Sequence, residues 1–472
     1  MKNNILYVFS LIFFLSCEKK EVEVFDVVIR NANVINILSG EINKQTLYIK
    51  NGRIKKITSQ NHLKFTSEFI IDAAGKYVLP GFWDNHVHFR GGDSLIQANK
   101  ETLQLFLMNG VTTVRDAGGD LTSYVMDWKD QIRQKTLVGP TIFSAGPKVD
   151  GQNSRWKGSL VVSNNYEINS VLDSLQKLKV DFVKLYDSSI SGALYLKTIA
   201  EASQRGLITS GHIPFNVQLD QTIEAGIGAI EHLYYILKGC SSIESSINEA
   251  IIKGEENFWS SMPKLLKTYE PLKAQNVFDK LVKADTYVVP TLRISDVLSQ
   301  LDIDNHSNDV YLKVMPKELL NTYKKRVLGF LESSEEIRND RKLIHDFFKV
   351  LTKSLSDARV KILAGSDTGA YNSYIYPGVS LHEELDAMVQ SGVSNLEALK
   401  ASAYNGANFL KKSSDYGSVE VGKISDLVIL ESNPLEDIKS TRDIEYVLKG
   451  SDVYNPDIIA IQLECSDCLE LK

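Results

Sequence analysis

The stretch Gly81-Phe82-Trp83-Asp84-Asn85-His86-Val87-His88 follows the apolar run Val78-Leu79-Pro80 and ends in a His-x-His pair. Side chains alternate between the two faces of a β-strand, so both imidazoles point the same way if this stretch is a strand. Two imidazoles on one rigid strand suit a divalent cation such as zinc. The pair alone also fits an ordinary surface strand, so the meaning of the motif depends on the rest of the chain.

The middle of the chain repeats one pattern, an apolar strand-like run followed by an amphipathic segment. These runs lie at 78–88, 111–116, 141–146, 181–186, 207–212, 228–232, 287–292 and 360–367. Eight such units predict an α/β fold, with a (β/α)8 TIM barrel over residues 80–405. In such a barrel the chemistry takes place at the C-terminal ends of the strands.

The two ends of the chain have a different pattern. Residues 25–79 alternate in short apolar runs broken by Asn51-Gly52, and similar runs return between residues 406 and 455. Short alternating runs separated by turn residues are typical of β-hairpins. We therefore expect residues 25–79 and 406–455 to build one small composite β-sandwich domain beside the barrel.

The first 17 residues have the three zones of a secretory signal: Lys2, an apolar stretch from Ile5 to Leu15, and Ser16-Cys17. The stretch is too short to span a bilayer. Phe14-Leu15-Ser16-Cys17 resembles the lipobox of bacterial lipoproteins, with Phe14 in place of the usual Leu or Val. That resemblance implies lipidation of Cys17, a tether over residues 18–24, and a membrane-anchored protein of the bacterial cell envelope that faces the periplasm or the cell surface. An ordinary signal peptide cut near Ser16 is the alternative.

Composition excludes some classes of protein and leaves others open. The chain has 472 residues, 43% of them hydrophobic and 24% charged, with a formal net charge of -6. A nucleic-acid-binding protein needs a basic face, so no nucleic acid partner is expected. Cys465 and Cys468 lie in a C-terminal tail, residues 456–472, and fit incidental thiols better than a redox pair, a metal clip or a local disulfide, because no second Cys-x-x-Cys completes a zinc site. Assembly with further copies of the chain stays open.

Two connections in the barrel region are too long for plain loops. They span about 238–285 and 293–359 and contain charged, helix-forming runs at 310–326 and 335–356. Long insertions of this kind either cover the mouth of the barrel as a lid or add outer helices, and the sequence favours neither.

Polar residues recur at the ends of the strand candidates. His86 and His88 end the first, His212 the fifth, His232 the sixth and Asp367 the eighth, while Lys184 lies in the fourth. All except Lys184 are natural zinc ligands. Their repeated position at the catalytic ends of strands predicts one shared metal site.

With these residues in place, the chain resembles the amidohydrolase superfamily, and within it the branch of imidazolonepropionase and the prolidase-like dipeptidases. The resemblance rests on the ligand positions and on three further segments: Ile71-Asp72-Ala73-Ala74-Gly75-Lys76-Tyr77-Val78-Leu79-Pro80-Gly81, Gly110-Val111-Thr112-Thr113-Val114-Arg115-Asp116, and residues 417–430 with Asn433-Pro434-Leu435.

The resemblance implies a site for two zinc ions. His86, His88 and Asp367 would bind the more buried ion, and His212 and His232 the second. Lys184 stands where the two-metal members carry a lysine that carbon dioxide converts to a bridging carbamate; mononuclear members do without it. Asp367 would act as general base and as proton shuttle to the leaving amine.

The resemblance therefore implies a metal-dependent hydrolase of an amide, dipeptide, acyl-amino acid or cyclic amide bond. The alternatives are a mononuclear imidazolone or lactone hydrolase or a deaminase, and a binding lipoprotein without turnover. Tyr234, Tyr235 and Arg293 follow strand ends and are candidate substrate contacts. Relatives often carry a Gly-Gly-His turn after the third strand, whereas residues 148–154 here read Lys-Val-Asp-Gly-Gln-Asn-Ser, so the dipeptide substrate is the least supported of these.

Overall fold

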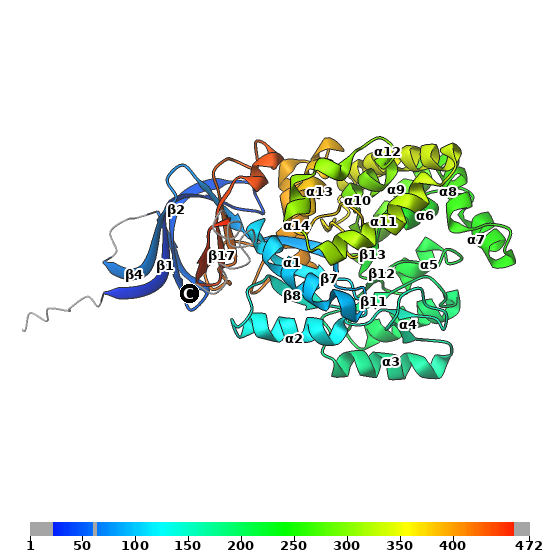
Figure 1. The fold of residues 1–472 in the computed structure, drawn as a ribbon, viewed down its shortest axis with the longest axis horizontal. Coiled ribbons are helices and arrows are strands. Elements are labelled where there is room, and N and C mark those ends of the chain that lie inside the picture. The colour runs from blue at the N-terminus through cyan, green and yellow to red at the C-terminus, as the bar shows by residue number, and fades with distance from the viewer. Residues whose placement is uncertain (1–21, 60–63, 457–472) are drawn as a thin grey trace, which may run out of the picture.

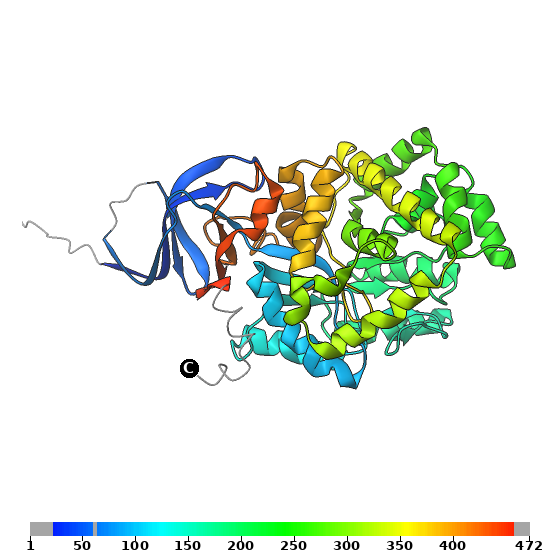
Figure 2. The ribbon, with the colours of Figure 1, turned by 45° about the horizontal axis from the view of Figure 1, so that its top comes forward.

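The computed structural model describes residues 22–59 and 64–456. The proposed signal and lipidation site at Cys17 and the tail cysteines Cys465 and Cys468 lie outside these residues. A β domain built from both ends of the chain lies at one end of the molecule, and the helices of the first insertion lie at the other (Figure 1). Figure 2 shows the same separation after a turn about the long axis. Among the described residues, no helix is long and apolar enough to cross a membrane.

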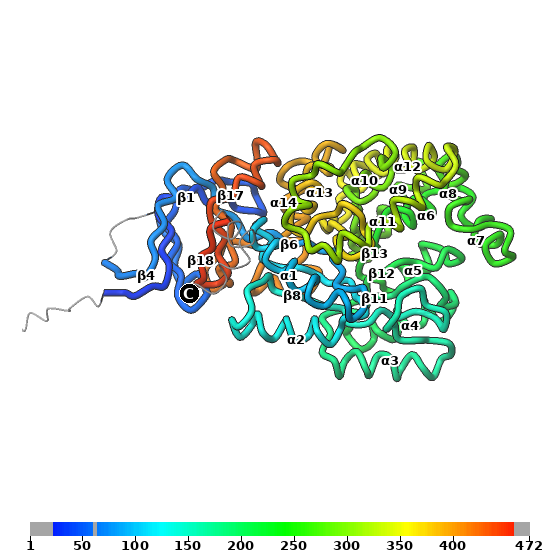
Figure 3. The backbone as a smooth tube through the Cα atoms, viewed as in Figure 1, coloured from blue at the N-terminus to red at the C-terminus, as the bar shows by residue number. Residues whose placement is uncertain are grey.

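The β domain joins chain segments that are far apart in sequence. Its strands are β1 (Glu23–Ile35), β2 (Ile42–Lys50), β3 (Arg53–Thr58), β4 (Phe65–Asp72), β5 (Tyr77–Pro80), β16 (Leu427–Leu430), β17 (Ile444–Lys449) and β18 (Asp452–Tyr454). β16 pairs with β5 and β17 with β16, so the blue and red ends of the tube lie side by side (Figure 3).

The hydrogen bonding of this domain differs from the two separate sheets of a sandwich. All eight strands belong to one sheet in the order β18-β17-β16-β5-β1-β2-β3, with β4 also paired to β1. The reason lies in β1, whose 13 residues are long enough to pair with β4 near its start and with β5 near its end. The curled sheet encloses its own core, which includes Val27, Ile29 and Leu427.

The barrel region contains two parallel sheets. One holds β15 (Thr368–Gly369), β6 (Phe82–His88), β7 (Val111–Asp116) and β8 (Thr141–Ser144), in that order. The other holds β10 (Leu160–Val161), β9 (Val149–Asp150), β11 (Val183–Leu185), β12 (Thr209–Gly211), β13 (Ala229–Glu231) and β14 (Tyr287–Val289). Asp181 N donates to Ser144 O at 2.9 Å between the two sheets, and on the far side a parallel bridge joins Val288 to Ile362. The strands therefore form a TIM-barrel-like arrangement.

The first predicted strand, 78–88, is divided in the structure. β5 ends at Pro80 and belongs to the β domain, while β6 begins at Phe82 and belongs to the barrel region. Gly81 lies between them against Thr112, where a Cβ would approach the Thr112 hydroxyl to 2.3 Å. Only glycine allows the chain to pass so close to β7 while it changes sheets.

The eighth predicted strand, 360–367, is also less regular than expected. Ile362 makes a single bridge, and the assigned strand β15 covers only Thr368–Gly369. Asp367 has φ 61°, outside the extended region, so the strand is interrupted at this residue. The observed strands of the barrel region are mostly shorter than predicted, because apolar runs continue past the last ladder hydrogen bond.

Helices surround these strands. Those between and after the strands are α1 (Ile96–Met108), α2 (Thr122–Arg133), α3 (Asn165–Lys177), α4 (Gly192–Gln204), α5 (Leu219–Glu224), α6 (Tyr234–Gly239), α13 (Val379–Gln390) and α14 (Asn395–Phe409). Short 3-10 turns occur at Asp93–Leu95, His306–Asn308, Val310–Lys313 and Ile438–Arg442.

The two insertions are helical. The first contains α7 (Glu244–Lys253), α8 (Phe258–Lys267) and α9 (Pro271–Ala284), and the region after β14 contains α10 (Leu292–Gln300), α11 (Lys317–Leu331) and α12 (Glu335–Asp357). α12 begins where predicted because the Ser334 side chain accepts a hydrogen bond from Ile337 N and two glutamates occupy the first turn. The expected helix at 310–326 instead begins at Lys317, after Pro316.

Candidate metal centre

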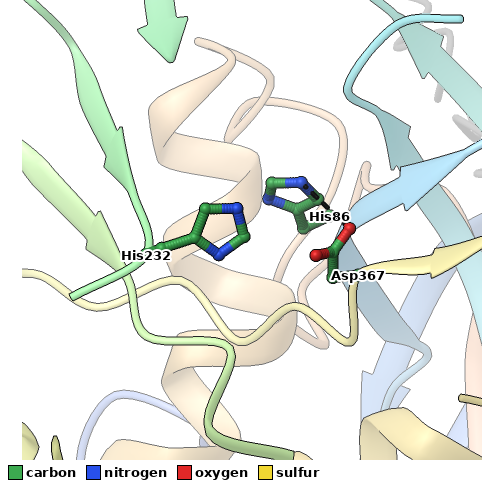
Figure 4. Close-up of side chains that lie close together, drawn as sticks. All are labelled: His86, His232 and Asp367. Atoms are coloured by element: carbon green, nitrogen blue, oxygen red, sulfur yellow. Dashed lines mark ion pairs between the residues drawn. The ribbon is translucent and has the colours of Figure 1, made fainter. Parts of the chain in front are cut away.

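Five of the six predicted ligands converge at the strand ends. His86 Nε2 and His88 Nε2 lie 3.2 Å apart, and Asp367 Oδ1 lies 3.6 Å and 3.3 Å from them, respectively. His212 Nε2 and His232 Nε2 lie 3.1 Å apart. Donor atoms of His86, His232 and Asp367 all lie within 4.8 Å of one another, and Figure 4 shows these side chains pointing toward a common centre.

The other nitrogen of each imidazole has its own partner. His86 Nδ1 lies 2.6 Å from Glu231 Oε2, His88 Nδ1 lies 2.8 Å from Gly118 O, and His212 Nδ1 lies 3.3 Å from Asp187 Oδ1. His232 Nδ1 lies 2.7 Å from the Thr291 hydroxyl. Acceptors of this kind behind a histidine orient the ring and leave Nε2 free for a metal.

These contacts fix where the protons are. A carboxylate or a carbonyl oxygen can only accept, so His86 and His88 both donate from Nδ1 and, as neutral rings, carry a lone pair on Nε2. The two lone pairs face each other across 3.2 Å. Because neither Nε2 carries a proton, the two nitrogens cannot form a hydrogen bond and repel each other. A cation between the rings turns this repulsion into ligation, so the donor set fits a divalent metal ion.

Burial favours the neutral form that ligation requires. Burial lowers the pKa of all four imidazoles, and the pKa of His88 and of His232 falls well below the usual value. Arg90 and Lys148 add to the effect at His88, and His212 adds to it at His232. Neutral imidazoles bind a metal without first losing a proton.

Two of the ligands have strained backbones. His232 has φ 68° and Asp367 has φ 61°, values that non-glycine residues rarely adopt. Backbone hydrogen bonds hold them there: His232 N donates to Val289 O at 2.9 Å, and Asp367 N donates to His86 O at 2.8 Å. Strain of this kind is concentrated at functional sites, where the surrounding structure maintains it.

Lys184 lies in β11 and is completely buried. Its Nζ lies 3.6 Å from Glu231 Oε1 and has no hydrogen-bond partner among the described residues. Burial lowers the pKa of Lys184 to about 8, against an opposing effect of Glu231. An unpartnered buried amine with a lowered pKa is available in its neutral form, which is the form that reacts with carbon dioxide.

A buried ion pair beneath the ligands was not among the sequence predictions. Arg115 Nη2 donates to Glu231 Oε1 at 2.9 Å, and the same carboxylate accepts from His86 and from the Ser210 hydroxyl. Burial alone would raise the pKa of Glu231, but Arg115, Lys184 and His86 together hold it well below the usual value. A charged residue within the apolar run 228–232 is the signal that could have found it, because buried charges need partners.

A cavity of about 360 Å³ opens onto the site. His88, His212, His232 and Asp367 line it, together with Tyr234 and Tyr235. This volume falls in the range of sites for small molecules. The Tyr235 hydroxyl donates to Asp187 Oδ2 at 2.7 Å. This hydrogen bond positions the Asp187 carboxylate, which in turn lies against His212 Nδ1.

Arg293, the third predicted substrate contact, has other partners. Its Nε donates to Glu383 Oε2 at 2.9 Å and its Nη1 donates to Asp296 Oδ2 at 3.0 Å. Among the described residues that line the cavity, the arginines are Arg90, Arg155 and Arg326, and Arg293 is absent. The structure therefore does not bring Arg293 together with the metal ligands.

The comparisons with known proteins agree with this geometry. The family model described as "Amidohydrolase family" matches residues 77–456. The chain therefore belongs to the amidohydrolase family. Solved structures with a similar fold include a Xaa-Pro dipeptidase with bound methionine, with 20% identity, a TM-score of 0.66 and coverage of 91% of this chain and 99% of that one. They also include a bottromycin amidohydrolase, with 18% identity, a TM-score of 0.72 and coverage of 93% and 89%.

Curated relatives match only in part. An adenine deaminase from Listeria welshimeri is 40% identical over 89 residues, which is 19% of this chain and 14% of that protein. An N-acetylglucosamine-6-phosphate deacetylase from Lysinibacillus sphaericus is 24% identical over 224 residues, 44% of this chain and 56% of that protein. These two matches thus span 14% of the Listeria welshimeri deaminase and 56% of the deacetylase. The family match, residues 77–456, includes the whole candidate metal centre.

Proposed function

We propose that the protein hydrolyses an amide or peptide bond of a small substrate, of the dipeptide or acyl-amino acid type, or a cyclic amide, with two zinc ions bridged by carboxylated Lys184. His86, His88 and Asp367 would hold one ion, and His212 and His232 the other. The observation that carries the proposal is the pair of Nε2 lone pairs that face each other across 3.2 Å, with both Nδ1 protons engaged elsewhere.

The chain's own residues would then bind, orient and move protons. Zinc, when bound, would polarise the substrate carbonyl and activate a water at neutral pH. Asp367 takes a proton from the nucleophile and delivers it to the leaving nitrogen. The partners of the four Nδ1 atoms keep the imidazoles in the ligating orientation; they are Glu231, Gly118, Asp187 and Thr291. Tyr234 lines the cavity and is a candidate contact for the substrate.

Metal content is the first test. We expect about two zinc ions per chain by elemental analysis of residues 18–472, purified without chelators and with bicarbonate present. Lys184→Gln removes the bridging group and should lower the content to about one ion, whereas Lys197→Gln, on an exposed position of α4, should leave it unchanged. Removal of metal by a chelator should abolish hydrolysis, and added zinc should restore it.

The alternatives predict other metal contents. About one ion in the unmodified chain would favour a mononuclear deaminase or an imidazolone or lactone hydrolase, for which the partial similarity to adenine deaminases is the supporting observation. No bound ion after reconstitution would favour a binding lipoprotein without turnover.

We also propose that the chain is a lipoprotein of the bacterial cell envelope, anchored through Cys17 and facing the periplasm or the cell surface. The lipobox-like stretch Phe14-Leu15-Ser16-Cys17 supports this. Protein extracted from membranes should begin at Cys17 and carry acyl chains by mass spectrometry, and Cys17→Ser should release it into the soluble fraction. A mature chain that begins at Cys17 without acyl chains, or a variant that stays with the membrane, would contradict the proposal.

A further inference from the structure

Three arginines from separate parts of the chain line the cavity over the metal ligands. Arg90 follows β6, Arg155 lies between β9 and β10, and Arg326 lies on α11 in the second insertion. In Figure 2 the yellow-green helix α11 lies among the helices of the barrel region. The insertion thus contributes a cationic side chain to the wall of the same cavity.

The three guanidinium groups have few direct partners. In the part of the chain that the structure describes, no ion pair with a carboxylate involves Arg90, Arg155 or Arg326. The Arg90 Nε donates to Ala370 O at 2.9 Å, and its guanidinium carbon lies 4.2 Å from the centre of the Trp156 ring. Arg326 Nη1 donates to the side-chain oxygen of Asn372. These contacts position the groups, and Asp367 acts on Arg90 and Arg326 only through space, without a direct ion pair.

The acids of the cavity do not balance these charges. Asp187 lies against His212 and the Tyr235 hydroxyl, and Asp367 belongs to the metal ligands. The Lys148 amine lies behind the wall with its Nζ 4.6 Å from the centre of the Trp156 ring, and burial lowers its pKa well below the usual value, so the three arginines carry the positive charge of this side. Lys148 is 2% exposed, and its Nζ has no hydrogen-bond partner among the described residues. This side of the cavity therefore favours an anion.

Arg326 is also linked to the proposed catalytic carboxylate. Its Nη1 donates to Asn372 Oδ1, and Asn372 Nδ2 donates to Asp367 Oδ1 at 2.9 Å. A guanidinium can only donate, so Arg326 fixes which way the Asn372 amide is turned, and the amide nitrogen then faces Asp367. Arg326 retains its other nitrogens for a ligand in the cavity, where a planar fork of donors suits a carboxylate or a phosphate.

Another part of the lining is aromatic. Tyr234 packs against Phe258, Trp259 and Phe348, with ring centres 5.1 Å, 5.9 Å and 5.0 Å away, and all four residues line the cavity. Such a wall favours a bulky apolar group over a polar one.

We propose that the substrate carries an anionic group remote from the scissile bond, that Arg326 with Arg90 and Arg155 binds this group, and that Arg326 positions Asp367 through Asn372. This inference rests on the proposed hydrolytic function and adds the substrate class, an anion with an apolar or aromatic half. The second insertion is then a determinant of specificity, because it supplies Arg326.

Binding of probes that cannot be hydrolysed tests the anion site without turnover. By isothermal titration calorimetry on the metal-loaded protein, 4-phenylbutyrate or phenethyl phosphate should bind about 10- to 100-fold more tightly than the neutral 4-phenylbutanol. Arg326→Gln and Arg155→Gln should each reduce this preference, whereas Lys324→Gln, on α11 outside the cavity, should preserve it. A tighter carboxylate indicates an amino-acid-like substrate, and a tighter phosphate indicates a phosphorylated one. Equal binding of all three probes, or anion binding unchanged in both arginine variants, overturns the inference.

Kinetics separate the positioning role from the anion site. With an N-acyl amino acid as substrate, Arg326→Gln should raise KM and lower kcat, because both the anion contact and the Asn372 contact are lost. Arg155→Gln should raise KM and leave kcat nearly unchanged. Arg326→Lys should recover part of the KM and little of the kcat, since it restores the charge without the planar fork. An unchanged kcat in Arg326→Gln would overturn the positioning role. If no substrate is turned over at any metal loading, the proposed function fails, while the probe titrations still decide the anion site.

Discussion

Asp367→Asn is expected to lower kcat by about 10²- to 10⁴-fold while the chain keeps most of its metal. Asparagine has the shape of aspartate and an oxygen that binds a metal weakly, but it cannot take up a proton at neutral pH. Four ligands remain: His86, His88, His212 and His232. The substitution therefore removes the proton carrier but leaves enough ligands to hold the metal.

The measurement combines steady-state kinetics with elemental analysis on the same sample. Asp357→Asn is a matched control, since Asp357 lies at the exposed end of α12 and, among the described residues, forms an ion pair with Lys353 alone. The control should retain the activity and metal content of the unmodified protein. An Asp367→Asn variant that turns over at the normal rate would contradict the proposed role of Asp367 as general base. Loss of both activity and metal would instead show that the main role of Asp367 is to bind the metal.

The convergence of the five candidate ligands is the part of the site that the sequence predicts well. His86 and His88 are two residues apart on β6, and the pleat of a strand puts them on the same side. His212 and His232 directly follow β12 and β13, so the parallel strands bring them to one edge. Periodicity and strand order therefore carry enough information to bring these side chains together before any coordinates are known.

The cavity wall was much less accessible to sequence reasoning. Arg293 follows β14 and was a reasonable candidate, but Glu383 and Asp296 hold its guanidinium. Arg326 reaches the cavity from a helix of an insertion, and no spacing in the sequence relates it to Asp367 or Asn372. Arg90 had a signal, because it is two residues after His88 and continues the alternation of the strand. Loop and insertion geometry depends on tertiary packing, which local patterns do not encode.

The strand boundaries show a similar limit. The run 78–88 is apolar throughout, and nothing in its hydrophobicity marks the change from the β domain to the barrel region at Gly81. That change is set by the contact of Gly81 with Thr112 on β7. The composite β domain itself was predictable from the alternation at both ends, while its single continuous sheet depends on the pairing of β1 with β4 and β5.

Glu231→Gln is the substitution with the largest expected effect on stability, about 3–5 kcal/mol of the free energy of unfolding. Glu231 and Arg115 are both fully buried, and the carboxylate also accepts from His86 and faces Lys184. Glutamine keeps the volume but loses the charge, so the guanidinium is left in a low-dielectric environment without a counter-ion. The His86 ring loses its charged acceptor too, and zinc affinity should fall by about 10- to 100-fold.

Urea unfolding of the metal-free protein and zinc titration measure the two effects separately. The folded pKa of Glu231 is below its ordinary value of 4.5, so the ion pair stabilises the fold above that pH and the stabilisation is lost as the pH falls below it. The difference between Glu231→Gln and the unmodified protein should therefore shrink in acid. Glu256→Gln is the control, because the pair of Glu256 with Lys264 lies at the surface and contributes little. Adding Arg115→Met to Glu231→Gln should recover part of the stability, since it removes the uncompensated charge. If Glu231→Gln alone lowers the free energy of unfolding no more than Glu256→Gln does, the buried pair does not hold the site together.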